Sequence, residues 1–235
     1  MHASHTGTIK GLLLDLDNTL YRYEPAHQAG LAVVLDCLHS LSKISKAELE
    51  LVYEQGKQQV KRRLHATAAS HHRLLYIQAM LEQLGSFSPK LTTDLYKQYW
   101  AAFFATMKPL PGLNESLGRL AETYRIGIIT NFVADIQYQK LEQLGIDHLI
   151  TYLITSEEVG CEKPDQKIFL AACKKMQLRP EELCMIGDDL AADIIPAQHL
   201  GMETYWLTPE PSTTQPEHSL FKTCSTFYDL EKRLS

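Results

Sequence analysis

An apolar run that ends in two carboxylates, within the segment LLLDLDNTLY at residues 12–21, constrains the fold of this chain more than any other feature. The leading leucines show no polar alternation, which is typical of a strand covered on both faces in a parallel sheet flanked by helices. An ionised carboxylate is costly to bury without a partner. We therefore expect Asp15 and Asp17 just beyond the carboxyl end of that strand, facing a crevice and a cation, with Asn18 and Thr19 forming a turn. A solvated turn at a strand end is the alternative for such a motif on its own.

The region after this segment has a different pattern. From about residue 24 onward, apolar residues recur three and four positions apart, which is typical of helices. A cluster of prolines and a glycine at 109–112 then breaks the chain. We predict an all-helical domain at residues 23–107, inserted into a parent domain formed by residues 1–22 and 108–235.

The remainder of the chain alternates short strands with helices. Repeated strand and helix units predict an α/β fold with a Rossmann-like parallel sheet and helices on both faces. A loop rich in Pro, Ser and Thr is expected at 208–217. Strands are expected at 125–130, 152–155, 183–186 and 203–207, and helices at 113–123, around 136–144, and at 166–176, 193–200 and 227–234.

Composition argues against several classes of function. With 45% hydrophobic residues, 22% charged residues and a formal net charge of -5, nothing in the chain calls for nucleic acid as a partner. The basic run Lys61–Arg63 lies in a helical pattern, where a solvated face explains it. The sequence has no signal-peptide core at its start and no window that could span a bilayer. Five cysteines without a C-x-x-C pair suit a reducing compartment, so we predict a cytoplasmic protein. The sequence does not predict its oligomeric state.

Polar groups suited to phosphate chemistry follow later strands as well. They are Thr130 with Asn131, Lys163, and Asp188 with Asp193. If the strands are parallel, these groups lie along the same edge of the sheet as the first two aspartates. Taken singly, Thr130 and Asp193 also fit helix N-caps, and Lys163 fits a surface lysine. The agreement of separate segments favours one joint site.

In this order and spacing the segments resemble the haloacid dehalogenase-like hydrolases, in the phosphatase branch with a helical cap inserted after the first motif. The resemblance spans residues 12–202. Asp15 to Thr19 resembles the first motif of the family, Thr130 the second, Lys163 the third, and Gly187-Asp188 with Asp193 the fourth.

The resemblance implies roles for these positions. Asp15 would attack a phosphoryl group to form an aspartyl-phosphate, and Asp17 would protonate the leaving oxygen and later deprotonate the hydrolytic water. A Mg²⁺ cofactor would be held by the carboxylates of Asp15 and Asp188 and the backbone carbonyl of Asp17. Asp193 would act indirectly, by orienting a metal-bound water or Lys163.

The same resemblance implies how phosphate would be bound. The Thr130 hydroxyl and the Asn131 backbone amide would contact phosphoryl oxygens, and Lys163 would offset negative charge. Asp189 departs from the family pattern, which often has a small residue there, and it is left as a competing metal ligand.

An acid at position 17 favours phosphoryl transfer over dehalogenation, because a halide leaves without being protonated. The predicted function is a magnesium-dependent phosphatase of a small phosphorylated metabolite, either a sugar phosphate or a nucleotide. Three alternatives stay open: a pyrimidine nucleotidase, which the DNTLY ending resembles, a sugar phosphomutase, and a non-catalytic module that binds a partner through its cap. Substrate choice is expected in the cap, where Arg73 in the polar run at 70–73 is a candidate contact, although a helix surface explains that run as well.

Overall fold

The structure is a computed structural model that describes residues 8–208 and 222–234. It divides into two compact units. The core unit comprises the chain up to Tyr21 and from Pro109 onward, and the helical unit comprises Arg22–Lys108. Of the loop expected at 208–217, only Thr208 falls within the described residues. Among those residues, no helix combines the length and apolar character that crossing a membrane requires.

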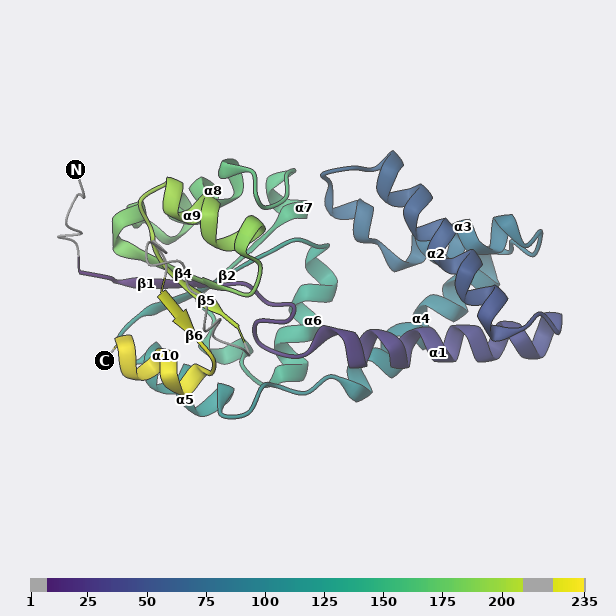
Figure 1. The fold of residues 1–235 in the computed structure, drawn as a ribbon, viewed down its shortest axis with the longest axis horizontal. Coiled ribbons are helices and arrows are strands. Elements are labelled where there is room, and N and C mark those ends of the chain that lie inside the picture. Colours follow the sequence, from purple (N-terminus) through teal and green to yellow (C-terminus); the bar gives the residue numbers. More distant parts are fainter. Residues whose placement is uncertain (1–7, 209–221, 235) are drawn as a thin grey trace. The chain divides into compact units, whose positions relative to one another are not determined.

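The core unit is built on a six-stranded sheet in which all neighbouring strands are parallel. The strand order is β3-β2-β1-β4-β5-β6 (Figure 1). In the centre, Leu14 of β1 lies opposite Ile128 of β2 and Ile186 of β4. The strands are β1 (Gly11–Leu14), β2 (Arg125–Thr130), β3 (Tyr152–Thr155), β4 (Leu183–Gly187), β5 (Glu203–Leu207) and β6 (Lys222–Cys224).

Helices cover both faces of this sheet, with α8 and α9 on one face and α5 and α10 on the other (Figure 1). This arrangement explains why every residue of β1 is buried, as its uninterrupted apolar run predicts. Under α8, Phe169 and Ile168 pack in one apolar cluster with Leu13 and Ile129. The helices of the core unit are α5 (Leu113–Ala121), α6 (Ala134–Leu144), α7 (Ser156–Val159), α8 (Gln166–Met176), α9 (Ile195–His199) and α10 (Phe227–Leu234).

The predicted α/β fold is confirmed, and most elements lie within a few residues of their expected positions. Two short elements, α7 and β6, were not expected, because three or four residues are too few to display a period. Helical structure begins before the helix expected at 193–200, although its α-helical part begins only at Ile195. A π-helical turn at Leu190–Ile194 precedes α9, and Pro196 stands in the first turn of α9, where its missing N–H costs little.

The helical unit contains four helices and one 3-10 turn within its described residues. Helix α1 packs on α4, and α2 packs on α3. Gly30 permits the first of these contacts, since a Cβ at that position would lie 2.8 Å from the carbonyl oxygen of Tyr99. The elements are α1 (Tyr23–Ser42), α2 (Lys46–Arg63), η1 (Ala68–His71), α3 (Arg73–Gln83) and α4 (Pro89–Thr106).

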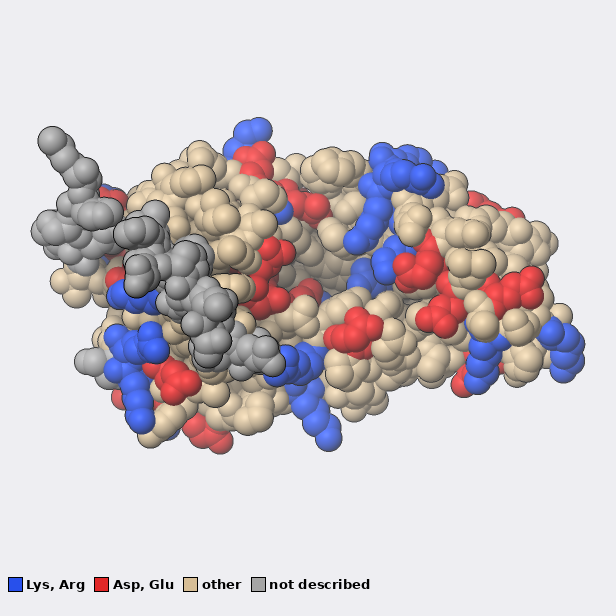
Figure 2. All heavy atoms as spheres, viewed as in Figure 1, with Lys and Arg blue, Asp and Glu red and all other residues tan. Residues whose placement is uncertain are grey.

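The basic run Lys61–Arg63 forms the exposed last turn of α2. Cationic side chains are favourable there, because the carbonyl end of a helix carries partial negative charge. On the face of the molecule shown in Figure 2, basic and acidic side chains are interspersed. The run is therefore explained by its place in the helix.

Candidate active site

The turn after β1 brings a buried carboxylate to the edge of the sheet. Asp15 is only 7% exposed, and its N–H donates to the carbonyl of Ile186 at 2.9 Å. Asn18 adopts a left-handed conformation with φ 64°, which asparagine tolerates better than most residues. The chain thereby turns back, and the hydroxyl of Thr19 lies 3.1 Å from Oδ2 of Asp15. A solvated turn is the wrong interpretation of this segment, because the first carboxylate is buried and partnered.

Lys163 is the cation that compensates this carboxylate. Its Nζ lies 2.6 Å from Oδ1 of Asp15, 2.7 Å from Oδ1 of Asp193 and 3.0 Å from the carbonyl of Ile129. The side chain is 3% exposed, so the surface-lysine interpretation is wrong. Burial by itself would lower the pKa of Lys163, but Asp15 and Asp193 raise it above its usual value. The amine is therefore held in its charged form between two acids.

The acids around Lys163 carry more negative charge than it can offset. Burial raises the pKa of Asp188 to about 6, and the nearby charge of Asp15 adds to this effect. Burial also raises the pKa of Asp193, against the opposing effect of Lys163. Because both acids are raised while the lysine stays charged, the cluster has a deficit of positive charge.

A divalent cation fits that deficit. Ligand oxygens from the carboxylates of Asp15, Asp188 and Asp193 lie within 4.8 Å of one another. The Thr19 hydroxyl, 3.0 Å from Oδ1 of Asp188, lies within hydrogen-bonding distance of both Asp15 and Asp188. Carboxylate oxygens are the donors that hard cations such as Mg²⁺ prefer. Three carboxylates against one lysine leave a formal charge of about −2 when all three are ionised, which such a cation would neutralise.

Two neighbouring residues shape this cluster. Asp193 lies against the backbone of Gly187, where a Cβ would come within 2.2 Å of its Oδ2, so glycine is required at that position. Asp189 is exposed, and its Oδ1 accepts hydrogen bonds from the N–H groups of Ala191 and Ala192 at 2.8 and 2.9 Å. Asp189 therefore caps the following helical turn, and it is outside the group of carboxylates that approach one another closely.

The end of β2 supplies the hydroxyl of Thr130, and the next residue, Asn131, forms two hydrogen bonds with the backbone of Lys163. Thr130 is buried as the last residue of β2, and α6 begins only at Ala134, so the N-cap interpretation of Thr130 is wrong. The side chain of Asn131 donates to the carbonyl of Lys163 at 2.9 Å and accepts from its N–H at 2.8 Å. This pair of bonds fixes the backbone that carries the lysine. Sequence reasoning placed Asn131 near the phosphate but missed this function of its side chain.

Two polar side chains of α6 were also missed. Gln137 is fully buried, and its Nε2 donates to Oγ1 of Thr130. Lys140 is 1% exposed, and its Nζ lies 2.6 Å from Oδ1 of Asp17, to which the hydroxyl of Tyr21 also donates. The signal was present in the sequence. Lys140 occupies a position in the apolar stripe of this helix that otherwise holds residues such as Leu144.

Arg73, the candidate substrate contact of the cap, lies in the helical unit. Its guanidinium lies over the rings of Tyr23 and Tyr76, 5.6 and 5.4 Å from their centroids. It donates to the hydroxyls of Tyr23 and Tyr99 and to the carbonyl of His71. The residue is half-buried within this unit, so the helix-surface interpretation is incomplete.

Comparisons with known proteins agree with this geometry. A model of the haloacid dehalogenase-like hydrolases matches residues 9–201. The chain belongs to this family. Ribulose-1,5-bisphosphate 5-phosphatase of Halopiger xanaduensis is 38% identical to this hydrolase over 209 residues, which cover 88% of this chain and 87% of that protein. The pyrimidine 5′-nucleotidase YjjG of Escherichia coli is 35% identical over 129 residues, or 54% of this chain and 56% of the nucleotidase.

Among solved structures, the hydrolase is similar to YfnB of Bacillus subtilis, whose crystals contain bound magnesium. The TM-score is 0.70 at 22% identity, and the match covers 97% of this chain and 99% of YfnB. At that level of identity the likeness establishes the fold.

Proposed function

We propose that this hydrolase is a magnesium-dependent phosphatase that cleaves a small phosphomonoester through an aspartyl-phosphate on Asp15. The observation that carries the proposal is the position of Lys163, whose Nζ bridges Oδ1 of Asp15 and Oδ1 of Asp193. A nucleophilic carboxylate must approach a dianionic phosphate, and a buried cation beside it lowers that repulsion.

The reaction proceeds in two displacements. In the first, a carboxylate oxygen of Asp15 bonds to phosphorus while the bond from phosphorus to the ester oxygen breaks, and Asp17 gives a proton to the leaving oxygen. In the second, Asp17 takes a proton from water as the water oxygen bonds to phosphorus. The bond between phosphorus and Asp15 then breaks, which releases inorganic phosphate and restores the Asp15 carboxylate and the protonated Asp17.

The donor set supports a role for Mg²⁺, with the carboxylates of Asp15 and Asp188 and the backbone carbonyl of Asp17 as its ligands and Asp193 as an indirect partner. When bound, the ion supplies positive charge to the phosphoryl oxygens and holds the phosphate against the nucleophile. Nζ of Lys163 lies 2.6 Å from Oδ1 of Asp15, where its positive charge offsets the negative charge of the carboxylate. Asp193 orients Lys163 through their ion pair of 2.7 Å.

Two groups at the end of β2, Thr130 and Asn131, would bind the transferred phosphoryl group. Oγ1 of Thr130 accepts a hydrogen bond from Gln137, so its own proton is available for a phosphoryl oxygen. The side chain of Asn131 is engaged by the backbone of Lys163, so only its backbone amide is proposed to donate to the phosphate. Arg73 and a capping role for the helical unit stay predictions from the sequence, as does a cytoplasmic location.

A sugar phosphate is the proposed class of substrate. The relative whose name contains a sugar bisphosphate aligns over 88% of this chain, whereas the nucleotidase aligns over 54%. An alignment that includes the helical unit carries more weight for substrate choice, because that unit contains none of the motif residues that the whole family shares. A pyrimidine nucleotidase and a phosphomutase are the alternatives that the same two acids permit.

The test is hydrolysis of para-nitrophenyl phosphate with and without Mg²⁺, by the wild type, Asp15→Asn and Asp189→Asn. Asp15→Asn should lower turnover by about 10³-fold or more, because the amide is a poor nucleophile. Asp189→Asn is the matched control. Asparagine caps a helical turn as well as aspartate does, so this variant should keep its turnover. Absence of metal-dependent hydrolysis by the folded wild type would contradict the proposal, as would an unchanged Asp15→Asn.

Phosphate release from ribulose 1,5-bisphosphate and from uridine monophosphate then decides between the substrate classes. Higher kcat/KM for the sugar bisphosphate supports the proposed class. Higher kcat/KM for the nucleotide favours the nucleotidase.

A further inference from the structure

A second buried lysine in the core unit, Lys140, has no place in the motifs that define the candidate site. Its side chain is 1% exposed and its Nζ lies 2.6 Å from Oδ1 of Asp17. The rings of Tyr21 and Phe132 lie 5.7 and 5.3 Å from the same nitrogen. A charged lysine is rarely buried unless it is paired. The burial of Lys140 therefore depends on its ion pair with Asp17.

The two buried lysines serve different carboxylates. Lys163 contacts Asp15 and Asp193, the proposed nucleophile and its neighbour. Lys140 contacts Asp17, the proposed proton donor. The described ion pair of Lys140 therefore acts on the group that handles the proton.

The position of Lys140 on α6 is informative. It follows Gln137 by three residues, so both side chains leave the helix on one face. Gln137 donates to the hydroxyl of Thr130, and Lys140 pairs with Asp17. One helix thus supplies polar contacts to two groups of the proposed mechanism, Thr130 at the end of β2 and Asp17 in the turn after β1.

We propose that Lys140 is a positioning residue for Asp17, on the basis of the function proposed above. The Asp17 side chain is 30% exposed and would rotate freely if it met only water. The ammonium of Lys140 and the hydroxyl of Tyr21 both engage Oδ1, which holds the carboxyl group in one orientation. A proton donor held in place transfers its proton more often than a mobile one, because less motion has to be lost on reaching the transition state.

This role predicts a dependence on the leaving group. The alkoxide released from a sugar phosphate must be protonated as it leaves, whereas para-nitrophenolate leaves readily without a proton. Loss of Lys140 should therefore lower kcat/KM for alkyl esters and spare it for the aryl ester, because kcat/KM reports only the first displacement and the second, in which Asp17 activates water, is common to both. A lysine that merely supported the fold would affect both esters alike.

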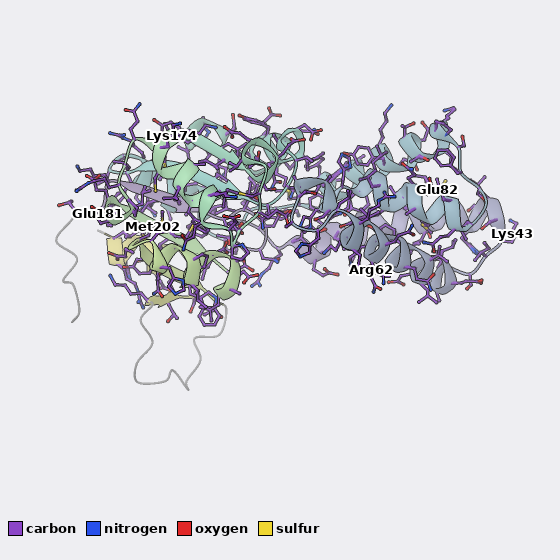
Figure 3. The ribbon with its side chains drawn as sticks, turned by 90° about the horizontal axis from the view of Figure 1, so that it is seen from above. Lys43, Arg62, Glu82, Lys174, Glu181 and Met202 are labelled. Carbon is purple, nitrogen blue, oxygen red and sulfur yellow. The ribbon has the colours of Figure 1, made fainter. Side chains whose placement is uncertain are left out.

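The experiment measures kcat/KM of the full chain with Mg²⁺ on para-nitrophenyl phosphate and on ribulose 1,5-bisphosphate. Lys140→Met keeps the volume of the stem and removes the charge. It should lower kcat/KM for the sugar bisphosphate by about 100-fold, the usual range for loss of general acid catalysis, and for the aryl ester by less than about threefold. Lys140→Arg should restore much of the difference. Lys174→Met, at an exposed lysine on α8 labelled in Figure 3, is the control and should leave both values unchanged.

Equal losses on the two esters, or no loss on either, would overturn the inference while the phosphatase proposal stands. A wild type inactive on both esters would overturn the proposed function and this inference together. Circular dichroism and thermal melting show whether each variant folds. If Lys140→Met fails to fold, Lys140→Gln, which keeps a polar end in the same space, is measured in its place, with the same selective loss expected.

Discussion

The core unit and the helical unit each place a charge among buried neighbours, and they balance that charge in opposite ways. In the core unit, three carboxylates gather around the single amine of Lys163. In the helical unit, the guanidinium of Arg73 lies over two tyrosine rings and donates to neutral oxygens. The first cluster has a deficit of positive charge, whereas the described contacts of the second hold a cation over aromatic faces.

The difference shows why one cluster is suited to binding a metal ion and the other is not. Neighbouring carboxylates repel one another in the absence of a bound cation. Binding of Mg²⁺ reduces that repulsion, which favours binding of the ion at this cluster. The described contacts of Arg73 are with aromatic rings and neutral oxygens, so this cluster contributes a positive charge and is not a cation site. Chemistry is thus expected at the first cluster and recognition at the second.

The largest effect is expected from crowding the acid cluster. Gly187→Ala introduces a Cβ within 2.2 Å of Oδ2 and 2.6 Å of Cγ of Asp193, so that carboxylate must move. Lys163 then loses one of its two acidic partners, and the metal site is distorted. We expect turnover to fall by about 100-fold or more, with weaker binding of Mg²⁺ measured by calorimetry.

Gly118→Ala is the matched control for this substitution. Gly118 lies in α5 with no neighbour within 4 Å of its ideal Cβ, and alanine is a better helix former than glycine. It should keep full activity and raise the free energy of unfolding by about 0.5–1 kcal/mol. Wild-type magnesium affinity in Gly187→Ala would show that the position of Asp193 is irrelevant to the site.

A smaller effect is expected from the helical unit. Arg73→Met removes the guanidinium and keeps most of the apolar contact with the rings. If recognition is the role of this cluster, KM for a sugar phosphate rises by about tenfold, since one hydrogen bond to a charged group is lost, and kcat changes less. Arg62→Met, at the exposed end of α2 (Figure 3), is the control. A lower melting temperature with unchanged KM would instead assign Arg73 to the stability of its own unit.

The smallest effect is an opposite pH dependence of the two units in metal-free protein. The folded pKa of Asp188 is about 6, above its usual 3.8, so its contribution to stability is present at low pH and lost as the pH rises through about 6. Burial lowers the pKa of His27 in the helical unit below its usual 6.5. Its contribution is therefore present above pH 6.5 and lost as the pH falls.

Hydrogen exchange resolved along the chain measures this contrast. Between about pH 5 and pH 7, after correction for intrinsic exchange rates, protection should fall in the core unit and rise in the helical unit. Addition of Mg²⁺ should cancel the trend in the core unit alone. The same trend in both units, with or without the ion, would contradict the difference in charge balance.

Much of the candidate site could be predicted because its residues follow strands. An apolar run that ends in a carboxylate is visible in one segment, and parallel strands bring such ends to one edge of the sheet. Asp15 and Asp188 directly follow β1 and β4, Lys163 and Asp193 lie further along the chain after β3 and β4, and all four meet at this edge. The polar partners on α6 were missed because a lysine or glutamine in a helical stripe is ordinarily explained by solvent, and only packing shows that Gln137 and Lys140 are buried.

The sequence by itself determined the order of elements, the parallel α/β core and the acids at its edge, because these follow from local periodicity and from the cost of burying charge. Only the tertiary structure decided how the charges are shared. Pairing of Lys140 with Asp17 joins residues 123 positions apart, and the hydrogen bonding of Asn131 to the backbone of Lys163 joins residues 32 apart. Such contacts depend on the distance between elements after packing, which no local pattern encodes.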